Sequence, residues 1–174
     1  MQMLKAGAPF PKQDVPELGG GTLTLGKAGR GHDWQLVVVY RGLHCPLCKT
    51  YLAKLDELKG RFNALGVDVV TVSGDPGDRA RAMAEELQLS MPVGYGLSTD
   101  QMRAVGVYVS EPRGPQETDR PFPEPGVFVI NGAGRLQIVD ISNAPFSRPD
   151  LESLAGGLEF IRANDYPVRG TWAA

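Results

Sequence analysis

The sequence has few of the residues that build disulfide scaffolds or metal centres. Of its 174 residues, only two are cysteine and two are histidine. Two cysteines are too few for a disulfide-stabilised scaffold, and too few alone for a four-ligand zinc site. His32 and His44 do not stand at a regular zinc-finger spacing from the cysteines. We therefore predict no metal and no other cofactor.

The sequence also lacks the features of membrane and nucleic-acid-binding proteins. No apolar run approaches the roughly 20 residues that span a bilayer. Gly7 and Pro9 interrupt the start of the chain before an apolar stretch of signal-peptide length, so we expect a cytoplasmic protein. The net charge is −2 and the basic residues are scattered, which disfavours nucleic-acid binding. We predict no membrane or nucleic-acid partner.

The cysteines are separated by only two residues. Cys45 and Cys48 lie between an apolar run at 34–40 and a helical pattern that begins at Leu47. A cysteine in the first turn of a helix faces unpaired backbone N–H groups, which stabilise the thiolate. A second cysteine one turn on can attack the first after it is oxidised. Redox chemistry is favoured over a pair of buried structural thiols.

The hydrophobic pattern predicts a single domain over 1–174 in which strands and helices alternate. The apolar content of 42% and charged content of 22% are ordinary for a globular protein. Strand, helix, strand, helix indicates a parallel α/β arrangement. The predicted elements are strands over 34–40 and 67–72, a helix from Leu47 that Gly66 closes, and a helix to about Leu89 with Asp75 as N-cap and Pro76 at N1.

The remaining segments are assigned from their turn and cap residues. Residues 98–106 are predicted as a short helix with a capping box at Ser98 and Gln101. The other predictions are an N-terminal lead-in over 1–20, an edge strand over 22–25, a long proline-rich loop over 109–126, a β-hairpin over 126–141 and a closing helix with Pro149 at N1.

The order of these elements resembles the thioredoxin fold, and more closely its peroxiredoxin-like, AhpC/TSA branch. The resemblance implies an α/β fold with a central mixed β-sheet flanked by helices on both faces. It is carried by the lead-in from Ala8, the segment Tyr40 to Cys48 (YRGLHCPLC), the segment Val72 to Asp75 (VSGD) and the strand from Pro125 to Ile130 (PGVFVI).

The resemblance leaves open which sulfur attacks. If the chain works like a thioredoxin, Cys45 is the nucleophile and Cys48 resolves. Counting without gaps from Tyr40 as in a peroxiredoxin, Cys48 falls on the peroxidatic cysteine. That alignment departs from the family's Pro-x-x-x-Thr-x-x-Cys pattern, with Arg41 for the proline and Cys45 for the threonine. We prefer Cys45, because a sulfur deeper in the helix is less accessible.

Several other residues are candidates for the site. His44 stands where thiol oxidoreductases commonly carry tryptophan, and an imidazolium there would stabilise a thiolate. Arg41 and Lys49 are sources of positive potential, or else solvated surface charges. Peroxiredoxins place a distant arginine beside the sulfur, for which Arg148 and Arg120 are the candidates.

Pro125 resembles the cis-proline that enters a strand in thioredoxins. A cis bond there would place its flanking backbone against the cysteines and shape the binding groove.

The main functional hypothesis is a thiol-dependent peroxidase with a hydroperoxide substrate and an external, thioredoxin-like dithiol as reductant. One alternative is a thiol–disulfide oxidoreductase that acts on protein disulfides. Another is a non-enzymatic redox sensor whose disulfide state alters the proline-rich loop at 109–126. Because peroxiredoxin relatives often dimerise, a homodimer is a candidate assembly.

Overall fold

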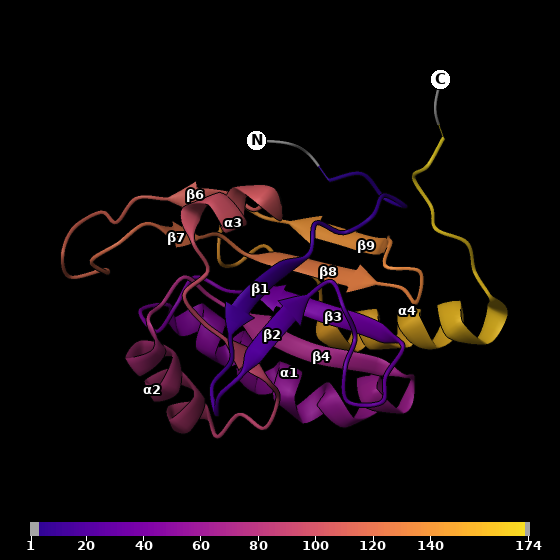
Figure 1. The fold of residues 1–174 in the computed structure, drawn as a ribbon, viewed down its shortest axis with the longest axis horizontal. Coiled ribbons are helices and arrows are strands. Elements are labelled where there is room, and N and C mark those ends of the chain that lie inside the picture. The colour runs from indigo at the N-terminus through magenta and orange to yellow at the C-terminus, as the bar shows by residue number, and fades with distance from the viewer. Residues whose placement is uncertain (1–3, 173–174) are drawn as a thin grey trace.

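A five-stranded mixed sheet forms the centre of the structure, a computed structural model that describes residues 4–172 (Figure 1). In spatial order the strands are β5 (Val93–Gly94), β4 (Val67–Val72), β3 (Trp34–Val39), β8 (Gly126–Ile130) and β9 (Leu136–Ile141). Strands β3, β4 and β5 run parallel, whereas β8 is antiparallel to both of its neighbours. The predicted mixed sheet is confirmed.

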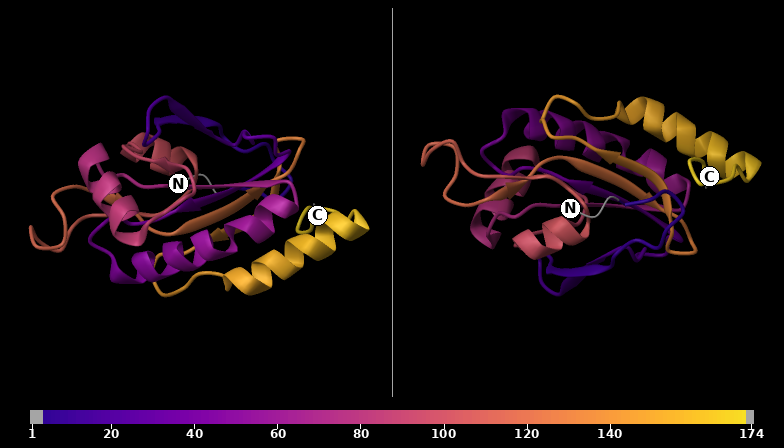
Figure 2. Two further views of the ribbon diagram at one scale, coloured as in Figure 1. Left: turned by 90° about the horizontal axis from the view of Figure 1, so that it is seen from below. Right: turned by 90° about the horizontal axis from the view of Figure 1, so that it is seen from above.

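Helices and one small hairpin cover the two faces of this sheet. Helices α1 (Pro46–Ala64) and α4 (Leu151–Asn164) run side by side on one face, with α2 (Gly77–Leu87) packed against α1 (Figure 2). The other face carries the short helix α3 (Thr99–Ala104) and the hairpin of β1 (Gln13–Pro16) and β2 (Thr22–Leu25). Helices thus lie on both faces, as predicted.

Strand β3 is buried on both sides, which explains its apolar sequence without alternation. Leu36 and Val38 face the core beneath α1 and α4, and Val37 and Val39 face the second core beneath α3. All four side chains are fully buried. Because β3 is the central strand, the chain that leaves it toward α1 starts from a rigid support.

Two predicted helix starts were wrong. Pro76, not Asp75, is the N-cap of α2, because the Asp75 carboxylate instead accepts a hydrogen bond from the Leu43 backbone N–H at 2.7 Å. Helix α2 ends at Leu87, near the predicted end at about Leu89, and Gln88 adopts a left-handed conformation with φ of 51°. Helix α4 begins after Pro149, because the side chain of Asp150 accepts from the Ser153 N–H and caps it.

Two segments predicted as irregular contain short strands. The proline-rich loop at 109–126 includes β6 (Val109–Ser110) and β7 (Phe122–Pro123), which pair antiparallel, and the predicted lead-in contains β1. Pro123 is tolerated because an isolated two-strand ladder leaves one side of each strand unpaired. Residues 1–3 of the lead-in lie outside the described residues. The capping box at Ser98 and the hairpin at 126–141 are confirmed.

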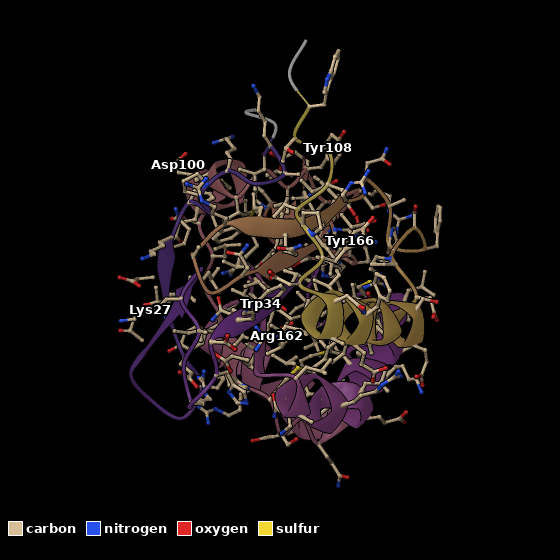
Figure 3. The ribbon with its side chains drawn as sticks, turned by 90° about the vertical axis from the view of Figure 1, so that its right-hand side faces the viewer. Lys27, Trp34, Asp100, Tyr108, Arg162 and Tyr166 are labelled. Atoms are coloured by element: carbon tan, nitrogen blue, oxygen red, sulfur yellow. The ribbon has the colours of Figure 1, made fainter. Side chains whose placement is uncertain are left out.

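The C-terminal end of α4 is fastened to the start of β3. The Arg162 guanidinium lies 4.8 Å from the centre of the Trp34 ring and forms an ion pair with Asp33 at 3.0 Å (Figure 3). Stacking and charge pairing together fix the helix orientation on the sheet.

Within the described residues, no helix is both long enough and apolar enough to cross a membrane.

Two glycines should respond in opposite ways to alanine. A Cβ at Gly157, in α4, meets no atom within 4 Å, so Gly157→Ala should raise the free energy of unfolding by about 0.5–1 kcal/mol. A Cβ at Gly126 would lie 2.6 Å from Val107 Cγ1, so Gly126→Ala should cost about 1–3 kcal/mol. Urea denaturation measures both, and equal shifts for the two variants would contradict this packing.

Candidate active site

A tight turn joins β3 to α1 and sets the position of the cysteines. Gly42 has a φ of 143°, and a Cβ there would lie 2.8 Å from the Asp75 carboxylate oxygens. Only glycine allows this approach without strain. Asp75 is 3% exposed, and burial raises the pKa of its carboxyl group. Its hydrogen bond from the Leu43 N–H holds the turn against the end of β4.

Cys45 is the N-cap of α1. Its backbone is extended, and its Sγ accepts a hydrogen bond from the Cys48 backbone N–H at 3.2 Å. Pro46 follows in the first turn, where a missing N–H costs nothing. The sulfur therefore occupies the place that serine or aspartate takes in other helix caps, facing the positive end of the helix.

The two thiols have opposite acidities. The hydrogen bond from the Cys48 thiol, together with the Cys48 N–H and the charges of Arg41 and Arg148, lowers the pKa of Cys45 to about 6. The same thiol–thiol bond, with burial, raises the pKa of Cys48. Both cysteines are free thiols, 2% and 0% exposed. This arrangement favours a Cys45 thiolate beside a protonated Cys48.

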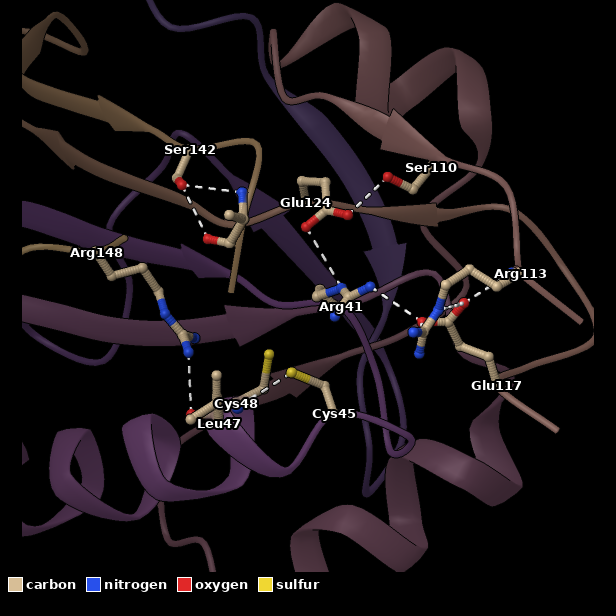
Figure 4. A network of polar contacts seen from close by, with 11 residues as sticks. Arg41, Cys45, Leu47, Cys48, Ser110, Arg113, Glu117, Glu124, Ser142 and Arg148 are labelled. Carbon is tan, nitrogen blue, oxygen red and sulfur yellow. Dashed lines mark hydrogen bonds and ion pairs between the residues drawn. The ribbon is translucent and has the colours of Figure 1, made fainter. Parts of the chain in front are cut away.

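Arg148 lies beside the cysteine pair (Figure 4). Its Nη2 donates to the Leu47 carbonyl at 3.0 Å, and its guanidinium lies 4.3 Å from the centre of the Tyr51 ring. The Tyr51 hydroxyl in turn donates to the Pro149 carbonyl at 2.9 Å. Among the described contacts, none joins Arg120 to either cysteine, and Arg120 pairs with Asp119 at 2.9 Å. Of the two candidate arginines, the structure brings Arg148 to the thiols.

Arg41 approaches the pair from the other side in the view of Figure 4. Its guanidinium lies 3.3 Å from the Glu117 carboxylate and 3.4 Å from that of Glu124. It also lies 4.6 Å from the centre of the Phe122 ring. Sequence reasoning missed these three partners. The acidic residues among the prolines were a signal, but no spacing connected them to Arg41.

The surroundings of His44 do not favour the positive charge considered for it. Its ring packs edge-on against Phe122, with the centroids 4.7 Å apart. Burial, reinforced by the charge of Arg41, lowers the pKa of His44, which disfavours the imidazolium. Lys49 is also engaged elsewhere, in an ion pair with Glu86 at 2.7 Å.

Pro125 lies at the same end of the central strands as the cysteines. It immediately precedes β8, whose Gly126 is paired with Val39 at the end of β3. The suggestion of a cis bond was wrong, because no peptide bond within residues 4–172 is cis. Extended backbone in β7 and β8 on either side accommodates the less costly trans isomer.

A groove of about 460 Å³ opens beside Arg148. Leu47, Tyr51 and the 80% exposed Phe146 are among its lining residues, so most of its wall is apolar. Residues 4–172 contain no cluster of three or more histidine, cysteine or acidic side chains placed to hold a metal ion.

The sheet order, the helix that starts at the cysteine pair and the hairpin beyond it define a peroxiredoxin-like form of the thioredoxin fold. The chain belongs to the AhpC/TSA family, whose sequence pattern matches residues 6–139. None of the curated proteins matches the chain in sequence.

Solved structures of peroxiredoxins are similar in fold. The peroxiredoxin-like protein from Aquifex aeolicus is 20% identical, with a TM-score of 0.74 over 92% of this chain and 90% of that chain. A mutant of peroxiredoxin 6 from Arenicola marina is 16% identical, with a TM-score of 0.77 over 93% and 76%. Peroxidoxin BcpB from Mycobacterium tuberculosis is 20% identical, with a TM-score of 0.73 over 93% and 99%.

The two cysteines should differ in their pH-dependent alkylation. In the reduced protein, Cys45 should react with iodoacetamide along a curve with its midpoint near pH 6, because its thiolate is stabilised. Cys48 should react only at a higher pH than an ordinary thiol, because the hydrogen bond to Cys45 and burial raise its pKa. Mass spectrometry of the two alkylated cysteines after brief exposure at each pH measures both curves. A Cys45 midpoint at the ordinary thiol value, or a lower midpoint for Cys48, would contradict this assignment.

Proposed function

We propose that the chain is a thiol-dependent peroxidase in which Cys45 attacks and Cys48 resolves. The observation that carries the proposal is the Cys45 sulfur at the N-cap of α1, accepting the Cys48 N–H at 3.2 Å. The pKa of Cys45, lowered to about 6, favours its thiolate at neutral pH, and Cys48 lies one helical turn away. Attack and resolution can then both occur within four residues.

The reaction takes place in two steps. The Cys45 thiolate attacks the terminal oxygen of a hydroperoxide, the O–O bond breaks, and the leaving alkoxide or hydroxide takes a proton to give an alcohol or water. Cys45 is thereby oxidised to a sulfenic acid. The Cys48 thiol then attacks its sulfur, water leaves, and the Cys45–Cys48 disulfide forms. An external dithiol, which is itself oxidised to a disulfide, restores both thiols.

Arg148 and Arg41 have complementary roles in this scheme. Both charges favour the Cys45 thiolate. Arg148 also borders the groove of Leu47, Tyr51 and Phe146, and we assign the binding of the hydroperoxide to this groove. We assign Arg148 the polarisation of the O–O bond, because its guanidinium can donate to the departing oxygen. The reducing cytoplasm would supply the thioredoxin-like reductant.

A second function is a thiol–disulfide oxidoreductase, and one specific observation favours it. Cys45 occupies the place of the threonine in the peroxidatic pattern, and Arg41 that of its proline. An N-cap thiolate followed by a buried thiol of raised pKa also suits exchange with protein disulfides. The two functions share the disulfide and differ only in the oxidant.

Variants of the two cysteines test the main proposal. Cys45→Ser should abolish peroxide turnover, because no other described sulfur is a stabilised thiolate. Cys48→Ser should consume one equivalent of peroxide and then stop, because resolution is lost. Arg148→Met should lower turnover by about 10-fold or more through loss of one charged donor. Peroxide consumption with a thioredoxin system measures all three.

An insulin-reduction assay on the same preparations separates the alternatives. Faster insulin reduction than peroxide consumption in the native protein would favour the oxidoreductase. If a single oxidation were followed by no further cycle despite reductant, the chain would be a redox sensor. Unchanged activities in both cysteine variants would contradict every thiol-based function.

A further inference from the structure

Groups far from the cysteines in sequence hold the Arg41 guanidinium. One of its nitrogens, Nη2, lies 3.3 Å from the Glu117 carboxylate, and Nε lies 3.4 Å from that of Glu124. The guanidinium also lies over the Phe122 ring. All three partners belong to the connection between β6 and β8, and Figure 4 shows the two carboxylates around Arg41. This connection therefore sets where the charge of Arg41 lies.

The Glu124 carboxylate is so deeply buried that it needs a positive charge beside it. Its residue is 4% exposed, and its Oε1 accepts from the Ser110 hydroxyl at 2.6 Å. Its Oε2 accepts no hydrogen bond from any described residue and faces the Arg41 Nε. A buried carboxylate without compensation costs several kcal/mol in general, so Glu124 and Arg41 hold each other in place.

Glu117 is a second, independently fixed carboxylate. It accepts hydrogen bonds from the Arg113 backbone N–H at 2.8 Å and from the Arg113 Nε at 3.2 Å. These bonds hold the pKa of Glu117 below its ordinary value, so the group is ionised. The Arg113 side chain is 87% exposed and its charge is screened by water. Arg41 is thus held between two anions.

We propose that Glu124 and Glu117 are positioning residues that fix the Arg41 guanidinium beside Cys45 and thereby set the reactivity of that thiol. This deepens the proposed function and rests on it for the catalytic consequence. The groups acting on Cys45 are Cys48, Arg41 and Arg148, and the two carboxylates act on it through Arg41. The planar guanidinium suits this role because it can meet two carboxylates at once.

The direction in which the pKa of Cys45 changes when Glu124 is replaced distinguishes a positioning role from a direct effect of charge. Loss of the negative charge of Glu124 would by itself favour the Cys45 thiolate and lower the pKa of Cys45. Loss of the ion pair between Glu124 and Arg41 would let the Arg41 guanidinium move toward Glu117, away from the Cys45 sulfur. The pKa of Cys45 would then rise. Positioning therefore predicts that Glu124→Gln raises the pKa of Cys45, although the variant removes an anion.

A double-mutant cycle, read by pH-dependent alkylation of Cys45 in the whole reduced protein, tests this inference. Glu124→Gln should decrease the thiolate-to-thiol ratio of Cys45 at a given pH by about threefold, the change that a shift of half a pKa unit produces. Arg41→Met should decrease it at least as much. In the double variant, Glu124→Gln should no longer raise the pKa of Cys45 above its value in Arg41→Met, because the positioned group is absent and only the loss of the anion remains. Glu111→Gln, at an exposed carboxylate of the same connection, is the matched control.

A pKa of Cys45 that falls or stays unchanged in Glu124→Gln would overturn the inference, as would an equal rise from Glu124→Gln in the Arg41→Met background. Thermal denaturation shows whether each variant folds. If Glu124→Gln does not fold, the same double-mutant cycle is measured with Glu117→Gln and Arg41→Met. The alkylation measurement needs no peroxide, so its result does not depend on peroxidase activity. A native protein without peroxidase turnover would contradict the proposed function, whereas the double-mutant cycle would still decide whether the carboxylates position Arg41.

Discussion

The chemistry proposed for this protein depends on one hydrogen bond, from the backbone N–H of Cys48 to the sulfur of Cys45. It makes a sulfur the cap of α1, so the unpaired N–H groups that begin every helix are directed at a thiol. The same geometry keeps the Cys48 thiol, to which we assign the resolving role, within one turn. Burial raises the pKa of Cys48, which keeps that thiol protonated.

Several parts of the fold act together to keep that bond in place. The fully buried strand β3 delivers the chain to the turn, and Asp75 receives the Leu43 N–H across it. Gly42 is needed because the carboxylate lies where any side chain would begin. Arg148 and Arg41 then bring positive charge from two directions, one from the segment before α4 and one from the end of β3. The site is thus assembled from segments that are distant in sequence.

The sequence predicted the central elements because their signals are local. The unbroken apolar run of β3, the capping box at Ser98 and the cysteines at a helix start each depend on neighbouring residues. The predictions that failed concerned side chains whose partners are distant in the sequence. The Asp75 carboxylate was expected to cap α2 and instead binds Leu43, and burial of the His44 ring, which packs against Phe122, disfavours the imidazolium. No local pattern reveals such a partner.

The central claim, that Cys45 is the sulfur that attacks peroxide, is tested most directly by trapping the first oxidation product. Reduced Cys48→Ser and Cys45→Ser proteins are each treated with less than one equivalent of hydrogen peroxide in the presence of dimedone, which captures sulfenic acids. The account predicts a dimedone adduct on Cys45 in the first variant and almost none in the second. A prominent adduct on Cys48 in the second variant, formed as fast as in the first, would contradict it.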